Sequence, residues 1–187
     1  MKKSKRDHIL ETAQKLFANQ GYQRTSVDQI IAAAEVAKMT VYNHFPTKAD
    51  LVTAVVRRRD QALIEYLTTK AAAADTPREK LLALFDALEA FVKTNPSEGC
   101  TFLNVIAEYA SADEEPRQAA ANHKASCHKY IQHLATQARA ADPQALADQL
   151  MLLIDGALSN ARRLNNHKPS ATAKQAAAIL INQQFDQ

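Results

Sequence analysis

The sequence predicts an all-α protein of about nine helices, and its composition and periodicity lead to this prediction. The chain has 187 residues, of which 36 are Ala, only 3 are Gly and 6 are Pro. Alanine has the highest helix propensity, and so few Gly and Pro residues leave few places for the turns that a β-sandwich or barrel requires. Hydrophobic residues recur at intervals of three and four positions, which places them on one face of a helix. A chain of this length can bury a sizeable hydrophobic core.

The first fifty residues predict three short helices. Apolar residues follow the helical period after Ile9, and Gly21 suits the left-handed position that ends a helix. Ser26 and Gln29 have the spacing of a capping box, in which each side chain accepts from the backbone N–H of the other residue. The expected ranges of these helices are about 9–20, 27–34 and 38–45.

Six further helices are predicted after them. Thr47 is expected to be the N-cap of the first of these. Proline is well tolerated at the first position of a helix, and four of the Pro residues stand directly before or at the start of helical segments. The expected ranges are about 48–74, 77–94, 100–110, 116–141, 143–164 and 169–185.

The net charge of the chain is located in its first quarter. Residues 1–50 carry eight Lys or Arg residues against five acidic ones, whereas the other 137 residues carry fifteen of each. The whole formal charge of +3 therefore belongs to the N-terminal segment. A basic end on a neutral body favours an anionic partner for that end, and nucleic acid is the first candidate.

Several classes of protein are excluded by what the sequence lacks. It has no run of about eighteen apolar residues, as a transmembrane helix would require. The basic N-terminus meets Asp7 and Glu11 before any apolar core, unlike a signal peptide. Two cysteines, Cys100 and Cys127, are too few for a disulfide framework and are typical of a reducing cytosol. We therefore expect a cytoplasmic protein that does not contact a membrane.

No catalytic motif is present, so we expect no enzymatic activity, no cofactor and no metal. The sequence has neither a Gly-rich phosphate loop nor a nucleophile elbow, and its six histidines are scattered. A helical adaptor that binds another protein is one alternative function. A thiol- or metal-sensing regulator is another, because His123 and Cys127 lie one helical turn apart and Cys100 could approach them.

The second and third predicted helices form the pattern of a helix-turn-helix, since only three residues join them. In such a unit the second helix presents its outer residues to the major groove of DNA. Lysine can bind phosphate or guanine, threonine and asparagine can contact base edges, and methionine can contact a thymine methyl group. A compact helical corner with a solvated polar face is the alternative. The predicted DNA-contacting residues are Thr25, Ser26, Lys38, Met39, Thr40, Tyr42, Asn43, His44 and Lys48.

Residues 9–55 resemble the DNA-binding domain of the TetR family of transcriptional regulators. The resemblance is strongest over residues 25–30 (TSVDQI) and 36–51 (VAKMTVYNHFPTKADL), and the spacing of Tyr42, Phe45 and Lys48 is its most specific part. It implies a dimeric, ligand-responsive repressor whose C-terminal domain binds an effector. By the same resemblance, the residues that would contact the DNA backbone are Tyr42, His44 and Lys48. Those that would lie nearer the bases are Met39, Thr40 and Asn43.

The chain departs from the family pattern around the predicted turn. The family usually has Gly, Ser and Gly where this chain has Glu35, Ala37 and Met39. The missing Ser removes an N-cap worth about 1 kcal/mol. Because Met39 supplies a side chain where most relatives have none, we do not expect the operator sequence to be shared with them.

A homodimer is expected because one recognition helix contacts too few base pairs to select a site in a genome. Two such helices about 34 Å apart match a palindrome. The last two helices carry small residues suited to close helix contact, although these faces could instead pack inside the chain. The small residues in question are Gly156, Ala157, Ala161, Ala176 and Ala177.

The fifth to eighth helices are expected to enclose a small, mostly apolar effector, whose binding would displace the fourth helix. Each apolar residue in this set, taken singly, could instead be part of the hydrophobic core. Asp155 is the best polar candidate, although it could instead pair with an arginine or with another helix. The predicted effector-binding residues are Phe85, Leu88, Phe102, Ile106, Tyr109, His123, Cys127, Met151 and Asp155. The expected domains are residues 1–47 for DNA binding and 48–187 for effector binding and dimerisation.

Overall fold

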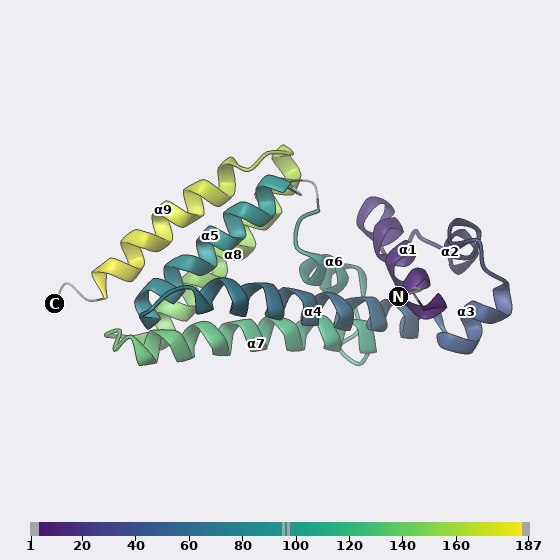
Figure 1. Cartoon of the computed structure of the whole chain (residues 1–187), viewed down its shortest axis with the longest axis horizontal. Helices are drawn as coiled ribbons and strands as arrows, with labels where there is room; N and C mark the ends of the chain where they lie inside the picture. Colours follow the sequence, from purple (N-terminus) through teal and green to yellow (C-terminus); the bar gives the residue numbers. More distant parts are fainter. Residues whose placement is uncertain (1–3, 95, 97, 185–187) are drawn as a thin grey trace. The chain divides into compact units, whose positions relative to one another are not determined.

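The computed structural model describes residues 4–94, 96 and 98–184 of the chain. These residues form nine α-helices and no strand (Figure 1), which confirms the predicted all-α class. None of the described helices is long and apolar enough to cross a membrane. Phe185, which the last predicted helix includes, lies outside the described residues. The helices are α1 (Lys5–Gln20), α2 (Val27–Ala34), α3 (Lys38–His44), α4 (Lys48–Ala72), α5 (Pro77–Thr94), α6 (Thr101–Glu108), α7 (Glu115–Gln137), α8 (Pro143–Leu164) and α9 (Lys168–Gln183).

The helices belong to two compact units. The first unit comprises residues 1–61 and 101–123, so it contains α1 to α3, the first half of α4, α6 and the start of α7. The second unit comprises residues 62–100 and 124–187, and it contains α5, α8, α9 and the remainders of α4 and α7. The predicted DNA-binding domain, residues 1–47, lies within the first unit.

The core of the first unit is built on the apolar face of α1. Ile9, Leu10 and Phe17 are at most 2% exposed, and the ring of Tyr22 stacks on that of Phe17 with centroids 4.9 Å apart. Burying side chains of this size contributes about 1.5–3 kcal/mol each. The buried residues that α2, α3 and α4 contribute to this unit include Ile30, Ala34, Val41, Leu51, Val52, Val55 and Val56.

The core of the second unit lies among α5, α8 and α9, which pack against one another. Phe85 and Leu88, predicted to contact an effector, belong to this core. Three of the small residues predicted for a dimer interface, Ala157, Ala161 and Ala177, also belong to it and are at most 3% exposed. The prediction was wrong for these three, because they let α8 and α9 approach inside the chain.

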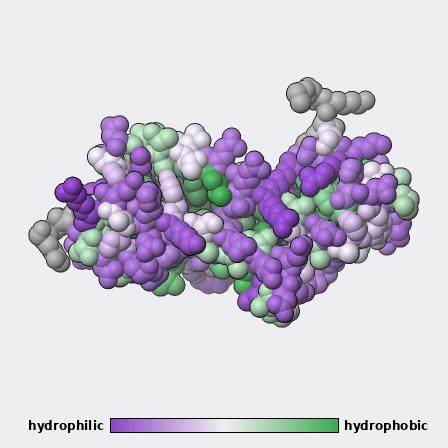
Figure 2. Space-filling view, turned by 90° about the horizontal axis from the view of Figure 1, so that it is seen from below, coloured by the Kyte–Doolittle hydropathy of each residue, from purple (hydrophilic) through white to green (hydrophobic). Residues whose placement is uncertain are grey.

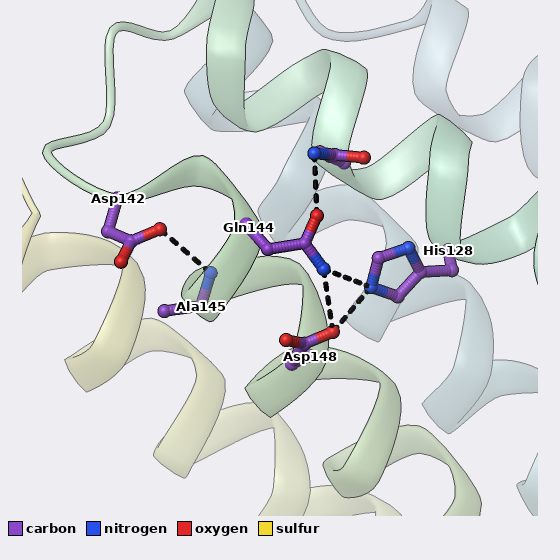
Figure 3. Close-up of polar contacts among 6 residues, drawn as sticks. His128, Asp142, Gln144, Ala145 and Asp148 are labelled. Atoms are coloured by element: carbon purple, nitrogen blue, oxygen red, sulfur yellow. Dashed lines mark hydrogen bonds and ion pairs between the residues drawn. The ribbon is translucent and has the colours of Figure 1, made fainter.

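Polar side chains join α7 to α8 in the second unit (Figure 3). The Nε2 atom of His128 lies 2.6 Å from Oδ1 of Asp148, and the amide of Gln144 donates to the same carboxylate over 3.1 Å. Asp142 is the N-cap of α8 and accepts from the backbone N–H of Ala145 over 2.9 Å. These polar groups lie at the surface. Figure 2 shows that hydrophilic residues cover most of the face turned toward its viewer.

A second polar cluster lies between α5 and α9. Its ionisation leads to a prediction of how the thermal stability of the fold depends on pH. Hydrogen bonds from Lys93 and Lys174 lower the pKa of Glu89 below its usual value of 4.5. A carboxylate whose pKa is lower in the folded state stabilises the fold above its unfolded pKa, and this contribution is lost as the pH falls. We therefore expect the thermal midpoint to decrease between pH 6 and pH 3, and to decrease less in the Glu89→Gln variant. Melting curves at four pH values would measure this. Equal losses in both proteins would contradict the role given to Glu89.

Candidate nucleic-acid interface

The start of α2 is fixed by the capping box that the sequence predicts. The backbone N–H of Gln29 donates to the Ser26 hydroxyl over 3.2 Å, and the backbone N–H of Ser26 donates to Oε1 of Gln29 over 2.7 Å. Ile30 and Ala34 then face the core of the first unit. The cap fixes the first helical turn of α2, and the apolar face fixes the rotation of α2 about its own axis. The direction in which α2 leads into the loop before α3 is therefore determined by local sequence.

The turn between α2 and α3 contains two of the residues that depart from the family pattern. Glu35 has φ 51° and ψ 43°, which is the left-handed conformation that glycine adopts most readily. Ala37 is the N-cap of α3 and makes no side-chain capping bond, as expected from the missing Ser. The helix is anchored instead by Val41 and Phe45, which are 0% and 3% exposed. Packing therefore replaces capping as the main support of α3.

Glycine at position 35 is expected to stabilise the fold. The left-handed conformation costs a residue with a Cβ atom about 1–2 kcal/mol, and part of the gain is offset by the greater freedom of glycine in the unfolded chain. Glu35→Gly should therefore raise the free energy of unfolding by about 0.5–1 kcal/mol in urea titrations. The matched control, Glu65→Gly within α4, should lower it by about 1 kcal/mol. Destabilisation by both changes would contradict this account of the turn.

The outer face of α3 is open to solvent. Lys38, Met39, Asn43 and His44 are exposed, and Thr40 and Tyr42 are half-buried. Met39 has 66% of its surface exposed, although it is a large hydrophobic residue. Met39 and Asn43 are four positions apart, so they lie on the same side of the helix. The structure thus brings together the side chains that the sequence predicts to lie nearest the bases.

Lys38, a positively charged residue of this face, lies close to two neighbouring side chains. The ammonium of Lys38 lies 3.5 Å from a carboxylate oxygen of Asp28 on α2 and 5.8 Å from the ring centroid of Tyr42. Both side chains of the ion pair are more than 60% exposed. A pair this exposed is worth at most about 1 kcal/mol, so a phosphate could displace the carboxylate at little cost.

Thr25 does not present its hydroxyl to solvent. It is fully buried, and Oγ1 donates to the backbone carbonyl of Gly21 over 2.7 Å. The predicted contact between this hydroxyl and DNA is therefore corrected: the side chain closes the turn between α1 and α2. Ser26, the next residue, is exposed at the start of α2 and can still reach an anion.

Lys48 begins α4 and is half-buried. Its Nζ atom donates to the backbone carbonyl of Gln23 over 2.9 Å, which links α4 to the turn before α2. Burial lowers the pKa of Lys48, and the charge of Glu108 opposes this change. The predicted phosphate contact would therefore come from an ammonium whose place is already set by the protein.

Two arginines of the first unit have partners that the sequence did not predict. The guanidinium of Arg6 lies 5.3 Å from the ring centroid of Phe45, beside the end of α3. Arg58 on α4 donates to Glu11 over 2.7 Å and to the backbone carbonyl oxygen of Asp7 over 3.1 Å. Both contacts join segments that are far apart in the sequence, and neither follows a periodic pattern.

Comparison with known proteins identifies the family. Residues 9–55 match the family model described as "Bacterial regulatory proteins, tetR family". Residues 77–177, more than half of the chain, match the model described as "Tetracyclin repressor-like, C-terminal domain". The chain belongs to the TetR family. It is a DNA-binding transcriptional regulator, as the resemblance implies.

Individual relatives of this TetR-family chain agree with the assignment. The HTH-type transcriptional regulator YjdC of Escherichia coli is 25% identical over 82% of this chain and 81% of its own length. The HTH-type transcriptional repressor DhaR of a Mycobacterium species is 29% identical over 60% of this chain and 56% of its own. The crystal structure of SCO4454, a TetR-family regulator from Streptomyces coelicolor, shares the fold. Its TM-score is 0.93, with 24% identity over 97% of this chain and 96% of that chain.

The predicted effector-binding residues of this TetR-family chain belong to both units. Four of them lie in the first unit, and five lie in the second. In the second unit, Asp155 is paired with Lys124 of α7, which is one of the alternatives that the sequence left open. The first-unit residues are Phe102, Ile106, Tyr109 and His123, and those of the second unit are Phe85, Leu88, Cys127, Met151 and Asp155.

His123 is buried and engaged within the first unit. Its Nδ1 atom lies 2.5 Å from Oδ1 of Asp60 on α4, and its ring stacks on Phe102 with centroids 3.4 Å apart. No group of three or more His, Cys, Asp or Glu side chains within residues 4–94, 96 and 98–184 is arranged to hold a metal ion. Cys100 is buried and Cys127 is half-buried.

A cleft of about 240 Å³ lies beside Asp60 in the first unit. Its lining is mostly polar, and none of the predicted effector-binding residues is part of it. The lining residues of the cleft are Arg57, Asp60, Glu115, Gln118, Ala119 and Asn122.

Tyr109, elsewhere in the first unit, is buried. Its burial raises the pKa of its hydroxyl to about 12, and this phenol is neutral at physiological pH.

Proposed function

We propose that this regulator is a repressor that binds a palindromic operator as a homodimer and is released by a small, mostly apolar effector. The observation that carries the proposal is the solvent-exposed face of α3, where Met39 and Asn43 lie side by side above a fully buried Val41. A short helix with a rigid apolar side and an open polar side suits insertion into a major groove. A relative named as a repressor supports the direction of control.

Two groups of contacts are proposed for the DNA complex. Met39, Thr40 and Asn43 would approach the base edges from α3. The remaining predicted residues, apart from the buried Thr25, would bind phosphates, since they supply hydroxyl, imidazole or ammonium donors. These backbone-binding residues are Ser26, Lys38, Tyr42, His44 and Lys48. The proposed functional division remains residues 1–47 for DNA and 48–187 for the effector and the partner subunit, with Lys48 at the boundary contributing a DNA contact from the start of α4.

The dimer surface is proposed to be the outer faces of α8 and α9. Leu152 has 74% of its surface exposed and Ile179 has 59%, although both are large aliphatic residues. Gly156 follows Leu152 by four positions, and a Cβ atom added there would meet nothing within 4 Å. These exposed residues, rather than the buried alanines, are available to pack against the same faces of a partner subunit.

Binding to DNA near the regulator's own gene tests the proposal. Purified protein should shift the intergenic fragment beside that gene in a gel. Its affinity should fall steeply between 50 and 200 mM salt, because several phosphates are neutralised. A protein-binding adaptor would show no such dependence. The absence of a shift at every palindrome in that fragment would count against the proposal.

A further inference from the structure

The turn between α1 and α2 is held by the last residue of α6. The backbone N–H of Gln23 donates to Oε2 of Glu108 over 2.7 Å, and the Gln23 side-chain amide donates to the Glu108 carbonyl oxygen over 3.2 Å. The carbonyl oxygen of Gln23 accepts from Nζ of Lys48 over 2.9 Å. Gln23 is therefore fixed by Glu108 on one side and fixes the ammonium of Lys48 on the other.

Gly21 leaves room for this carboxylate. Its φ of 87° lies in the region that favours glycine, and a Cβ atom there would lie 3.2 and 3.3 Å from the two carboxylate oxygens of Glu108. Both distances are shorter than ordinary van der Waals contact. The carboxylate of Glu108 therefore packs closely against the backbone of this turn, and it also accepts a hydrogen bond from it.

The end of α6 that carries Glu108 is itself supported. The guanidinium of Arg117 on α7 donates to the carbonyl oxygens of Ile106 and Tyr109, and Tyr109 is 5% exposed. These contacts satisfy carbonyl groups that a helix end leaves without partners. The backbone on both sides of Glu108 is therefore held, so its carboxylate can act as a fixed acceptor.

We propose that Glu108 is a positioning residue for DNA binding, which acts through Gln23 to place the ammonium of Lys48 for a phosphate. This inference rests on the proposed function, because it requires that Lys48 contacts DNA. The geometry supports it in two ways: the backbone N–H and the side-chain amide of Gln23 both donate to Glu108, and the backbone carbonyl of Gln23 is the acceptor for Lys48. An ammonium held in place loses less conformational entropy when it binds an anion.

Glu108 has a second effect, which weakens DNA binding. Its negative charge is close enough to interact with the ammonium of Lys48, so it also repels a phosphate that approaches this ammonium. Glutamine at this position would keep an oxygen that accepts from the Gln23 N–H and would remove the charge. Alanine would remove both. The two substitutions therefore separate the positioning role from the charge.

The test compares four proteins with the wild type: Glu108→Ala, Glu108→Gln, Lys48→Met and the double variant Glu108→Ala/Lys48→Met. Each is titrated with a duplex selected by the wild-type protein, at constant salt and well below the thermal midpoint of every variant. Glu108→Ala should bind about tenfold more weakly than the wild type, and Glu108→Gln should bind at least as tightly. In the Lys48→Met background, Glu108→Ala should change the affinity by less than about twofold.

Three results would overturn the inference. Glu108→Ala could bind as tightly as the wild type, Glu108→Gln could bind as weakly as Glu108→Ala, or the loss could be equal with and without Lys48. The last result would assign Glu108 a general structural role that does not act through the ammonium. If the wild-type protein selects no duplex at all, the proposed function fails instead, and this outcome is distinct from the other three.

Discussion

Replacing Leu152 and Ile179 with Glu is expected to produce a monomer that no longer holds its operator. Each side chain is well exposed on one of the last two helices, and each would bring a charge into the proposed interface of the dimer. A dimer gains affinity because the second recognition helix binds at a high effective concentration once the first is bound. Loss of the dimer should therefore weaken operator binding by about 100- to 10,000-fold.

Ile64 provides a matched control for this double variant. It is 42% exposed on α4, and Ile64→Glu makes the same chemical change on a helix that is not part of the proposed interface. Sedimentation should show a monomer for Leu152→Glu/Ile179→Glu, and a dimer for Ile64→Glu and the wild type. If the double variant remains a dimer with full affinity, the partner subunit packs on another surface.

Asn43→Ala is expected to weaken binding to the preferred operator and to leave non-specific binding almost unchanged. Asparagine can donate to and accept from one adenine, and such a pair is worth about 1–3 kcal/mol per half-site. A dimer makes the contact twice, so the whole operator should lose about 2–6 kcal/mol. Non-specific affinity depends on phosphate contacts, and Asn43 carries no charge.

The matched control is Asn19→Ala, which changes an exposed asparagine at the end of α1. It should bind both operator and random duplex like the wild type. Competition titrations with the two kinds of DNA would measure the ratio of affinities. A uniform loss on both DNAs in Asn43→Ala would show that this residue contacts the backbone rather than a base.

The helices and their boundaries could be predicted because local signals determine them. The capping box at Ser26 and the three-residue turn before α3 act over a few positions, and the structure contains both of them. Gly21 also ends α1 with a positive φ of 87°, but its ψ of 164° differs from that of the predicted left-handed conformation. The end of α7 is an exception, since the prediction extends to residue 141. Arg139 adopts a left-handed conformation with φ 60°, and α7 ends at Gln137. No Gly or Asn marks this turn, so the sequence carries no signal for it.

The contacts that position the candidate site could not be predicted in the same way. The bond from Gln23 to Glu108 joins residues 85 positions apart, and it follows from how α6 packs in the first unit. Likewise, a threonine at a helix start can face solvent or close a turn, and only the structure shows that Thr25 is buried. The small residues of α8 and α9 suit a partner subunit or the chain's own core equally well, because periodicity does not distinguish the two.

Selection of DNA from a random library by the purified wild-type protein tests the central claim most directly. Sequencing of the bound fragments should reveal a two-fold symmetric motif whose half-sites lie about one helical turn apart, or a multiple of it. Two copies of α3, related by the symmetry of a dimer, would account for such a motif. Enrichment of no sequence, or of a motif without two-fold symmetry, would contradict the account.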